Sequence, residues 1–186
     1  MNHLKLTSEI PPSVNHYLAY RGVLKKGKPI AMSYKTPDAV KYQKQFAEYV
    51  KKEVKKQKYN LVPNKERHFY VDGIFYFPRI DMDANNYWKV LLDAITDSGM
   101  IWCDDNVVCE RVKRIFYDNK NPRVELEVYP VEYIGIFDDL PQLEEFESRC
   151  VGCKRYKRNC SILKKAIEGR IQQEIINGEC LKHSNN

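Results

Sequence analysis

Residues 69–77 read FYVDGIFYF and are rich in aromatic and β-branched side chains. Such side chains favour a β-strand because they pack well on a pleated surface. Gly73 lies in the middle of the run, where a glycine often marks a β-bulge. The sequence therefore predicts a strand with a bulge at Gly73, and an acidic segment begins soon after the strand, at Asp81.

The segment before this strand predicts a short strand, a loop and a helix. Residues 4–7 alternate apolar and polar side chains, as a strand does. The breaker cluster at residues 11–15 starts a loop, which we expect to run through Gly27. A helix start signal at Thr36 is followed by apolar residues at intervals of three or four, and these predict an amphipathic helix to about Lys58.

The segment after the strand predicts one helix and two strands. Residues 86–97 carry apolar side chains on one helical face, and Gly99 follows as a stop signal. Strands are predicted over residues 107–116 and 123–129, joined by a turn at residues 118–121.

The composition and texture of the chain predict one domain and an appendage. Hydrophobic residues make up 43% and charged residues 30%, apolar runs are too short to span a bilayer, and no secretory signal precedes them, so we expect a cytoplasmic protein. Beyond Pro130 follow an acidic segment, a cysteine cluster and a predicted helix over residues 161–176. We expect an α/β (α+β) domain over residues 1–130, with a mixed sheet and helices on its faces, and a helical extension over residues 131–186.

The charges are unevenly distributed along the chain. The formal net charge of +6 suits a polyanionic partner, although the total alone decides little. Lysines are concentrated in residues 41–58, and lysines and arginines are concentrated in residues 154–158. Acidic residues are concentrated in residues 81–105 and 138–147. An acidic centre in basic surroundings is typical of a nuclease, and a solvated helix face explains either basic cluster equally well.

Asp81 and Asp83 are the first candidates for a metal site. If the strand after Phe77 continues, their side chains share one face, and Asn85 follows on that face. Two neighbouring carboxylates repel each other, but a divalent cation such as Mg²⁺ neutralises them. The alternative is that Asp83 and Asn85 cap the following helix.

A third carboxylate, from Asp104 or Asp105, would close such a site. Metal ions held by carboxylates polarise a phosphoryl oxygen, activate water and stabilise the leaving oxygen in phosphodiester hydrolysis. Lys89, one turn into the predicted helix, would stabilise the charge that develops on the phosphoryl group. The alternative is that Asp104, Asp105 and Asn106 form a polar turn between helix and strand.

The acidic segment resembles the signature of the RusA family of Holliday-junction resolvases. That signature runs Asp-x-Asp-Asn-x-x-Lys, then Asp-Ala on the same helix, then a Gly and an Asp-Asp pair before a strand. It is matched here by Asn86-Tyr87-Trp88-Lys89, Asp93-Ala94, Gly99 and Asp104-Asp105. The stretch Pro11-Pro12-Ser13-Val14-Asn15-His16-Tyr17 resembles the opening motif of the family, so the resemblance covers roughly residues 4–129.

One position departs from the family pattern. The second Asp of the signature directly precedes the Asn, whereas Asn85 stands there in this chain. Either Asp83 and Asn85 occupy the two family positions and Asp81 is an addition, or two residues are inserted and Asp81 with Asp83 is the pair. Asp83 belongs to the site in both alignments.

The resemblance implies the roles of the site residues. Asp81, Asp83 and Asp105 would be Mg²⁺ ligands, Lys89 would stabilise charge, Asp104 would be a supporting or alternative ligand, and Asn85 and Asn86 would support the site. The family also implies a homodimer that places paired nicks symmetrically across a four-way DNA junction, in recombination and repair. Short resolvases of this kind resemble recombination genes of mobile elements, which implies that the chain is encoded by a bacterial prophage or a phage.

DNA recognition would then rest mainly on phosphate contacts. The candidates are residues of the lysine-bearing helix and of the first loop: Lys44, Lys51, Lys55, Asn15 and Tyr17. Tyr17, Tyr20 and Phe69 are candidates for stacking on exposed bases, with a place in the core as the alternative.

Cys150, Cys153 and Cys160 have a spacing found around zinc and iron–sulfur clusters. Cys180 is the nominal fourth ligand, but a straight helix over residues 161–176 would be about 24 Å long at ~1.5 Å per residue and would carry Cys180 away. A break near Gly169 would be required. The alternative is three free thiols packed under a loop.

Two further functions remain open from the sequence. The departure at Asn85 is compatible with a branched-DNA-binding protein that has no catalytic activity. The cysteine array is compatible with a metal- or redox-responsive interaction protein. Cys103 and Cys109 are expected to be small core residues.

Overall fold

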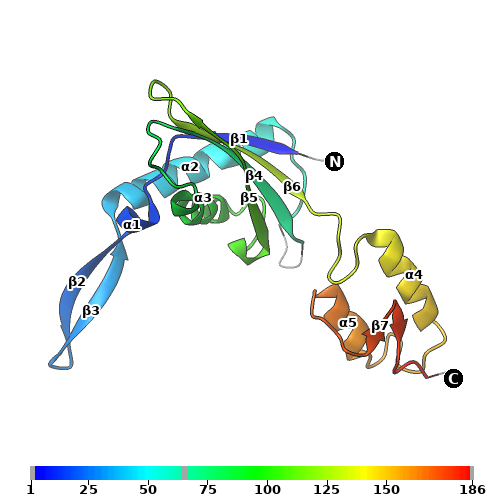
Figure 1. Cartoon of the computed structure of the whole chain (residues 1–186). Coiled ribbons are helices and arrows are strands. Elements are labelled where there is room, and N and C mark those ends of the chain that lie inside the picture. Colours follow the sequence, from blue (N-terminus) through cyan, green and yellow to red (C-terminus); the bar gives the residue numbers. More distant parts are fainter. Residues whose placement is uncertain (1–2, 64–66, 185–186) are drawn as a thin grey trace. The chain divides into compact units, whose positions relative to one another are not determined.

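The computed structural model describes residues 3–63 and 67–184. The chain forms two compact units, Met1–Pro130 and Val131–Asn186, which are treated separately below (Figure 1). The first unit is a mixed α+β structure, in agreement with the predicted fold class. Within the described residues, no helix is long and apolar enough to cross a membrane.

A four-stranded mixed sheet forms the centre of the first unit. Its order is β1 (Leu4–Ser8), β6 (Arg123–Pro130), β4 (Phe69–Phe77) and β5 (Val108–Tyr117), with β4 parallel to β5 and β6 antiparallel to both β1 and β4. The predicted strand and its bulge are confirmed, because the β4–β5 register shifts between Gly73 and Ile74.

The turn between β5 and β6 crosses the end of β4. The Asp118 side chain accepts hydrogen bonds from the backbone N–H groups of Lys120 (3.1 Å) and Asn121 (3.0 Å), which confirms the predicted turn. The backbone N–H of Asp118 donates to the carbonyl oxygen of Phe77 at 2.7 Å. Strands β5 and β6, which this turn joins, are not neighbours in the sheet, because β4 lies between them.

Helices α2 (Pro37–Lys56) and α3 (Asn85–Ser98) pack on each other and against one face of the sheet (Figure 1). Alternate strand residues are buried on that face, as expected for a sheet with one covered face: Leu4, Leu6, Phe69, Val71, Phe75, Phe77, Val124, Leu126 and Val128. Gly99 ends α3 in the left-handed conformation (φ 65°), as predicted. The expected ends of both helices agree with the observed ends to within two residues.

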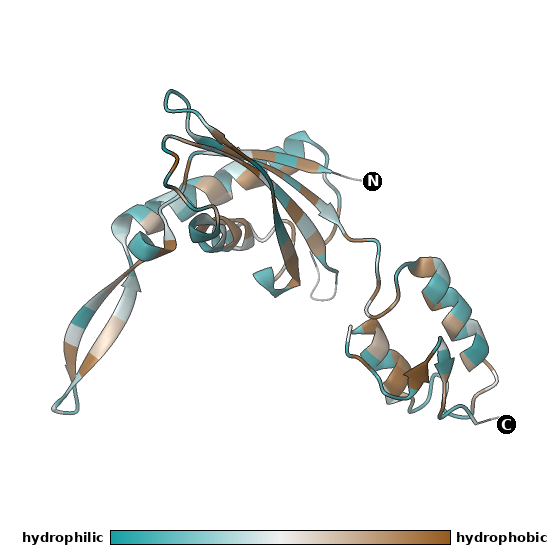
Figure 2. Ribbon diagram, viewed as in Figure 1, coloured by the Kyte–Doolittle hydropathy of each residue, from teal (hydrophilic) through white to brown (hydrophobic). Residues whose placement is uncertain are grey.

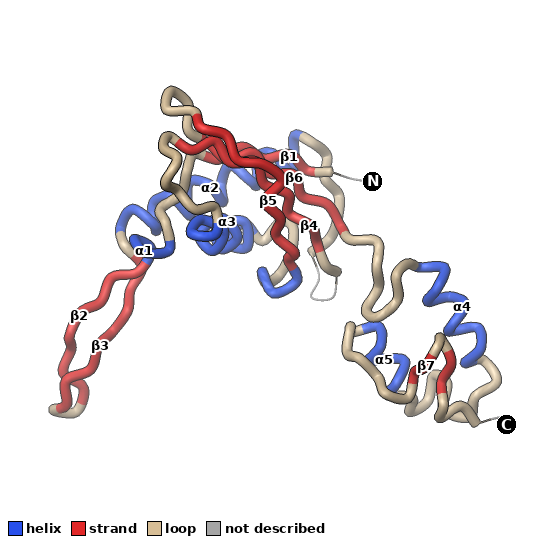
Figure 3. Tube along the Cα trace, viewed as in Figure 1, coloured by secondary structure: helices blue, strands red, loops and turns tan. Residues whose placement is uncertain are grey.

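The predicted loop through Gly27 is wrong, since this segment is a β-hairpin. After the short helix α1 (Val14–Tyr17), β2 (Leu18–Lys25) pairs with β3 (Lys28–Lys35). Positive φ angles at Lys26 (51°) and Gly27 (76°) form the two-residue turn that suits the twist of a hairpin. The hairpin extends away from the sheet and helices of its unit (Figure 3), and hydrophobic residues line both of its strands (Figure 2).

The second unit is small. It contains α4 (Leu140–Cys150), α5 (Ser161–Ile167), β7 (Ile175–Ile176) and β8 (Glu179–Cys180), around a core centred on Phe137 and Phe146. The predicted helix over residues 161–176 is wrong in its second half. It ends at Ile167 because Gly169 adopts a left-handed conformation (φ 79°) and its N–H closes the last turn on the carbonyl of Ala166 at 3.0 Å.

Candidate active site

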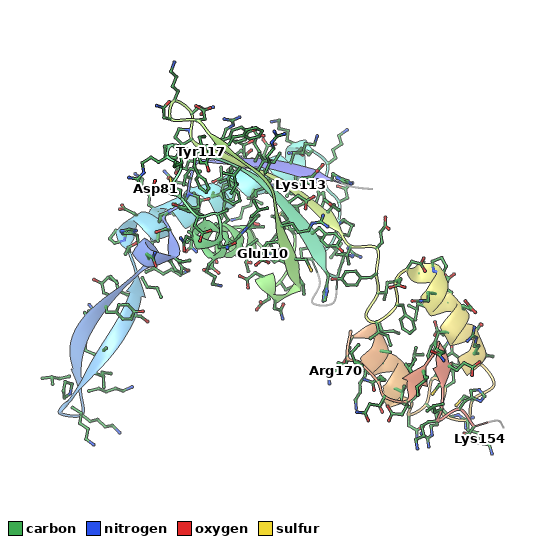
Figure 4. The ribbon with its side chains drawn as sticks, in the orientation of Figure 1. Asp81, Glu110, Lys113, Tyr117, Lys154 and Arg170 are labelled. Carbon is green, nitrogen blue, oxygen red and sulfur yellow. The ribbon has the colours of Figure 1, made fainter. Side chains whose placement is uncertain are left out.

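The acidic segment does not continue strand β4. The strand ends at Phe77, directly before Pro78, so Asp81 and Asp83 lie in the loop that leads to α3. Asp81 is exposed and its Oδ1 lies 3.2 Å from Nε of Arg79 (Figure 4). Oδ1 of Asp83 accepts a hydrogen bond from the backbone N–H of Asn85 at 3.0 Å. The expectation that the two carboxylates share the face of a strand is therefore wrong, and Asp83 helps to begin the helix.

Helix α3 places three polar residues along one line. Asn85, Lys89 and Asp93 are spaced four apart and so lie on the same face. Lys89 Nζ donates to Asp93 Oδ1 at 2.7 Å and to Asp105 Oδ2 at 3.1 Å. The hydrogen bond to Asp93 is the largest cause of a raised Lys89 pKa, and the bond to Asp105 adds to it although burial opposes it. The ammonium form of Lys89 is thus stabilised between two carboxylates.

Asp105 reaches Lys89 from a short 3₁₀ helix, η1 (Asp105–Val107), that connects α3 to β5. Oδ1 of Asp104 caps this helix by accepting the backbone N–H of Asn106 at 3.0 Å. The predicted polar turn is therefore present, and so is the predicted contribution of this turn to the site. Of the two carboxylates, Asp105 contacts Lys89, whereas Asp104 is an exposed helix cap.

Sequence reasoning missed the network behind Lys89. Asp93 Oδ2 accepts a hydrogen bond from the Tyr17 hydroxyl at 2.5 Å and one from Gln43 Nε2 at 3.4 Å, and Lys35 Nζ donates to Gln43 Oε1 at 2.8 Å. Burial raises the pKa of Asp93, but the hydrogen bonds from Lys89 and Tyr17 outweigh it and hold that pKa below its usual value. The spacing of Asp93, one helical turn after Lys89, could have predicted their contact. Gln43 and Lys35 are distant in the sequence, and only the fold brings them close to Asp93.

The predicted DNA-binding residues lie in different environments. Tyr17 is buried with its hydroxyl on Asp93, and Phe69 is fully buried in the core, so neither ring is open to stack on a base as had been considered. Tyr20 is 72% exposed on β2, and Asn15 is exposed on α1. On α2, Lys44 and Lys55 are exposed, whereas Lys51 Nζ pairs with Glu48 at 2.7 Å.

No metal cluster is preformed within residues 3–63 and 67–184, where no three His, Cys, Asp or Glu side chains are arranged to hold an ion. The site does offer carboxylate and amide oxygens from Asp83, Asn85 and Asp105, the hard donors that Mg²⁺ requires. Because Mg²⁺ is commonly held by one or two carboxylates together with a substrate phosphate, the donor set fits this ion.

The cysteines fall into two groups. Cys150, Cys153, Cys160 and Cys180 belong to the second unit and are all partly buried. In the first unit Cys109 is partly buried, whereas Cys103 is exposed, so the expectation that Cys103 is a core residue is wrong.

The family model Endodeoxyribonuclease RusA matches residues 9–129. The chain belongs to the RusA endodeoxyribonuclease family. The match runs from the residue after β1 almost to the end of β6, so it includes Lys89, Asp93 and Asp105. Among curated proteins, none matches the chain significantly. RusA family membership indicates an endodeoxyribonuclease that acts on DNA junctions, and the cysteine-bearing unit lies outside the matched region.

Proposed function

We propose that this RusA family protein is a Mg²⁺-dependent endonuclease that resolves four-way or related branched DNA by paired, symmetric nicks in recombination or repair. The observation that carries this proposal is the Lys89 ammonium, held between Asp93 and Asp105 inside the family match. A charged donor on a rigid helix, next to oxygen ligands for a metal ion, suits the dianionic charge of a phosphoryl transition state.

In the proposed mechanism Asp83 and Asp105 would hold Mg²⁺, and Asp81 or Asn85 would complete the site. When bound, the ion would supply Lewis-acid stabilisation of the phosphoryl oxygens and activation of the attacking water. Lys89 donates to a non-bridging oxygen of the scissile phosphate. The oxygen of water attacks phosphorus, the bond from phosphorus to one sugar oxygen breaks, and a proton from the water ends on that sugar oxygen. The products are a hydroxyl on one strand end and a phosphate monoester on the other.

Asp93 acts through Lys89 in this mechanism. With a hydroxyl donor from Tyr17 on its other oxygen, Asp93 keeps the ammonium oriented when a substrate phosphate competes with Asp105. Fixed donors of this kind lower the barrier because they need no reorganisation during the reaction.

The activity is tested by nicking of a synthetic four-way junction with and without Mg²⁺. We expect Asp83→Asn and Asp105→Asn to lower the rate by more than about 100-fold while junction binding persists, since each removes a metal ligand. Asp97→Asn is the matched control, because Asp97 is an exposed carboxylate in the last turn of the same helix. Comparing Asp81→Asn with Asn85→Ala decides which of the two completes the site.

Two rival functions give different results in the same assay. A DNA-binding protein without catalytic activity would bind the junction but leave it uncut at every Mg²⁺ concentration. An interaction protein centred on the cysteines would lose all activity when residues 140–186 are deleted, and Asp83→Asn would leave its activity intact.

The DNA contacts of the proposed enzyme involve the β2–β3 hairpin as well as α2. Residues 18–35 contain five basic residues and no acidic ones: Arg21, Lys25, Lys26, Lys28 and Lys35. Tyr20 and Tyr34 are exposed on the same hairpin, by 72% and 44%. Basic and aromatic side chains on an exposed ribbon suit the phosphates and open bases at a branch point.

Salt dependence of junction binding separates the two basic elements. Each lost phosphate contact reduces the slope of log K against log salt by about 0.9. We expect the triple variant Lys25→Ala, Lys26→Ala, Lys28→Ala to reduce the slope by roughly two to three. The matched variant on α2 is Lys44→Ala, Lys52→Ala, Lys55→Ala. An unchanged slope in the hairpin variant would assign binding to α2 alone.

The proposed homodimer is supported by the edge strand β5. It has ten residues, and its outer edge is unpaired in the described sheet. Val112 and Ile115 are each 40% exposed on this strand, and Tyr117, labelled in Figure 4, is 58% exposed. Exposed strand edges are templates for pairing with a second chain. Sedimentation of the full chain should give twice the mass of 22.0 kDa, and a monomer that cuts only one strand per encounter would contradict paired nicking.

A further inference from the structure

The second unit brings four thiols to the region between α4 and α5. Cys150 is the last residue of α4, Cys153 lies in the turn that follows, Cys160 caps α5, and Cys180 is on β8. Cys150 and Cys180 pack against the same small core and line one pocket together with His183. The Cys150 thiol is partly buried, and Cys160, Cys180 and Cys153 are its electrostatic neighbours.

Cys180 returns to Cys150 because α5 is short. After the helix ends, β7 and β8 form a small hairpin whose turn has positive φ angles at Asn177 and Gly178. The carbonyl of Gly178 accepts a hydrogen bond from Arg149 at 3.0 Å, which ties the turn to the end of α4. The helix that would have carried Cys180 away ends before it can do so.

Cys153 lies in a tight turn of the backbone. The N–H of Cys153 donates to the carbonyl of Cys150 at 2.9 Å, and the N–H of Tyr156 donates to the carbonyl of Cys153 at 3.0 Å. Lys154, labelled in Figure 4, donates its N–H to the carbonyl of Ser184 at 3.0 Å. The turn therefore keeps Cys153 close to Cys150 and ties it to the last described residue of the unit.

The hydrophobic core of the second unit is too small to stabilise its fold alone. Five apolar residues are buried in its described part, residues 131–184: Phe137, Leu143, Phe146, Ile162 and Ala166. Units of this size usually need a structural metal ion, disulfides or oligomerisation. The six cysteines are all free thiols in this structure.

We propose that Cys150, Cys153, Cys160 and Cys180 together bind one Zn²⁺ ion, which holds the second unit in its fold. Four thiols give up their protons to solvent as four Zn–S bonds form, the ligand set of a closed structural site. No three of these side chains share a ligand geometry in the structure, so binding requires rotation of the cysteine side chains. The first two ligands come from the turn at the end of α4, and the last two from the cap of α5 and from β8.

Zinc content of the full-length protein, purified under reducing conditions, tests the site directly. We expect about one Zn²⁺ per chain in the wild type, and a more than tenfold weaker affinity in Cys180→Ser. Cys103→Ser is the matched control, because it removes an exposed thiol of the other unit and should leave the zinc content unchanged. Loss of zinc only from His183→Ala, with Cys180→Ser unaffected, would overturn the assignment of the fourth ligand.

Thiol alkylation of the unmutated chain keeps the proposal testable if the variants fail to fold. Zinc should protect Cys150, Cys153, Cys160 and Cys180 from alkylation, and a chelator should expose them while the labelling of Cys103 stays the same. Equal labelling of the four thiols with and without zinc would refute the site. Two disulfides in place of zinc would appear as a mass loss of about four hydrogens under non-reducing conditions and would also refute it.

Discussion

At the scale of single residues, the unit related to RusA uses paired charges in two ways. On one side of the sheet, Lys89 is shared by two carboxylates that remain partly accessible. On the other side, Asp72 is buried in β4, and Arg111, Lys113 and Tyr129 satisfy its oxygens at 2.7–2.8 Å. In the first arrangement the Lys89 ammonium stays accessible to a phosphate, because its side chain is about half exposed. The second arrangement stabilises the fold.

Replacing Asp93 by Asn should impair catalysis more than binding. The variant keeps the side-chain shape but leaves Lys89 with Asp105 as its only paired carboxylate, so we expect a cleavage rate lower by about 10- to 100-fold with little change in junction affinity. An unchanged cleavage rate, or a junction affinity that falls as far as the rate, would contradict this role of Asp93.

Replacing Asp72 by Asn should lower stability in a pH-dependent way. Burial raises the pKa of Asp72, but the bonds from Arg111, Lys113 and Tyr129 outweigh it and hold the pKa below its usual value. The stabilisation is therefore present above that ordinary value and lost as pH falls through the folded-state pKa. We expect urea denaturation near pH 7 to show a loss of roughly 2–3 kcal/mol, with half-exposed partners limiting the effect.

Stability measurements at acid pH test whether the charge of Asp72 is responsible for its effect. The difference between wild type and variant should shrink at acid pH, as the pH falls through the lowered pKa of Asp72 and the wild-type carboxyl becomes protonated. A constant difference would mean that packing and not charge is lost. Glu110→Gln, an exposed change on β5 (Figure 4), should stay within about 0.5 kcal/mol.

At the scale of elements, β4 and α3 approach each other closely at Gly73. A Cβ placed on Gly73 would lie 2.6 Å from the ring of Trp88, the residue that precedes Lys89. The glycine therefore sets how closely the helix approaches the strand, and this distance also positions the proposed site.

Gly73→Ala should move α3 and destabilise the first unit. We expect a loss of about 1–3 kcal/mol, since an added methyl group in a packed core forces its neighbours to shift. Gly22→Ala is the control, because a Cβ there meets nothing within 4 Å, and its effect should stay within about 0.5 kcal/mol. Thermal denaturation of both variants checks this, and equal melting temperatures would contradict the close approach.

The elements that the sequence predicted are those with a strong local pattern. The strand at residues 69–77 and the helices after Thr36 and Asn86 bury one face each, and that burial appears as periodicity. The β2–β3 hairpin was missed because its apolar residues stay exposed and its turn is Lys26-Gly27, not the more familiar Asn-Gly. The order of the strands is set by contacts across the whole unit, and no local pattern records it.

The candidate site was predictable to the same degree. Lys89 and Asp105 carry a sequence signature, and the fold brings them together. Asp81 was grouped with Asp83 on the assumption of a continuing strand, which ends at Phe77 instead. Tyr17 and Gln43 reach Asp93 from 76 and 50 positions away, and such contacts arise only from tertiary packing.

At the scale of the whole molecule, the two units have separate hydrophobic cores. The core of residues 1–130 lies between the sheet and its helices, and the core of residues 131–186 includes side chains of α4 and α5. Separate cores unfold independently unless an interface couples them. Calorimetry of the full chain loaded with zinc should therefore show two transitions. A chain ending at Pro130 should keep one of them, shifted by no more than about 4 °C, and loss of both would show that the first unit depends on the second.

The central place of β6 also bears on how the protein is made. Leu4 pairs with Val128, so the first strand has no partner until the ribosome has added more than a hundred further residues. At about 5–20 residues per second, β1 waits for roughly 6–25 s. During that time its edge and one edge of β4 are open to other nascent chains. Synthesis that stops before β6 therefore yields an aggregation-prone fragment and not a smaller enzyme.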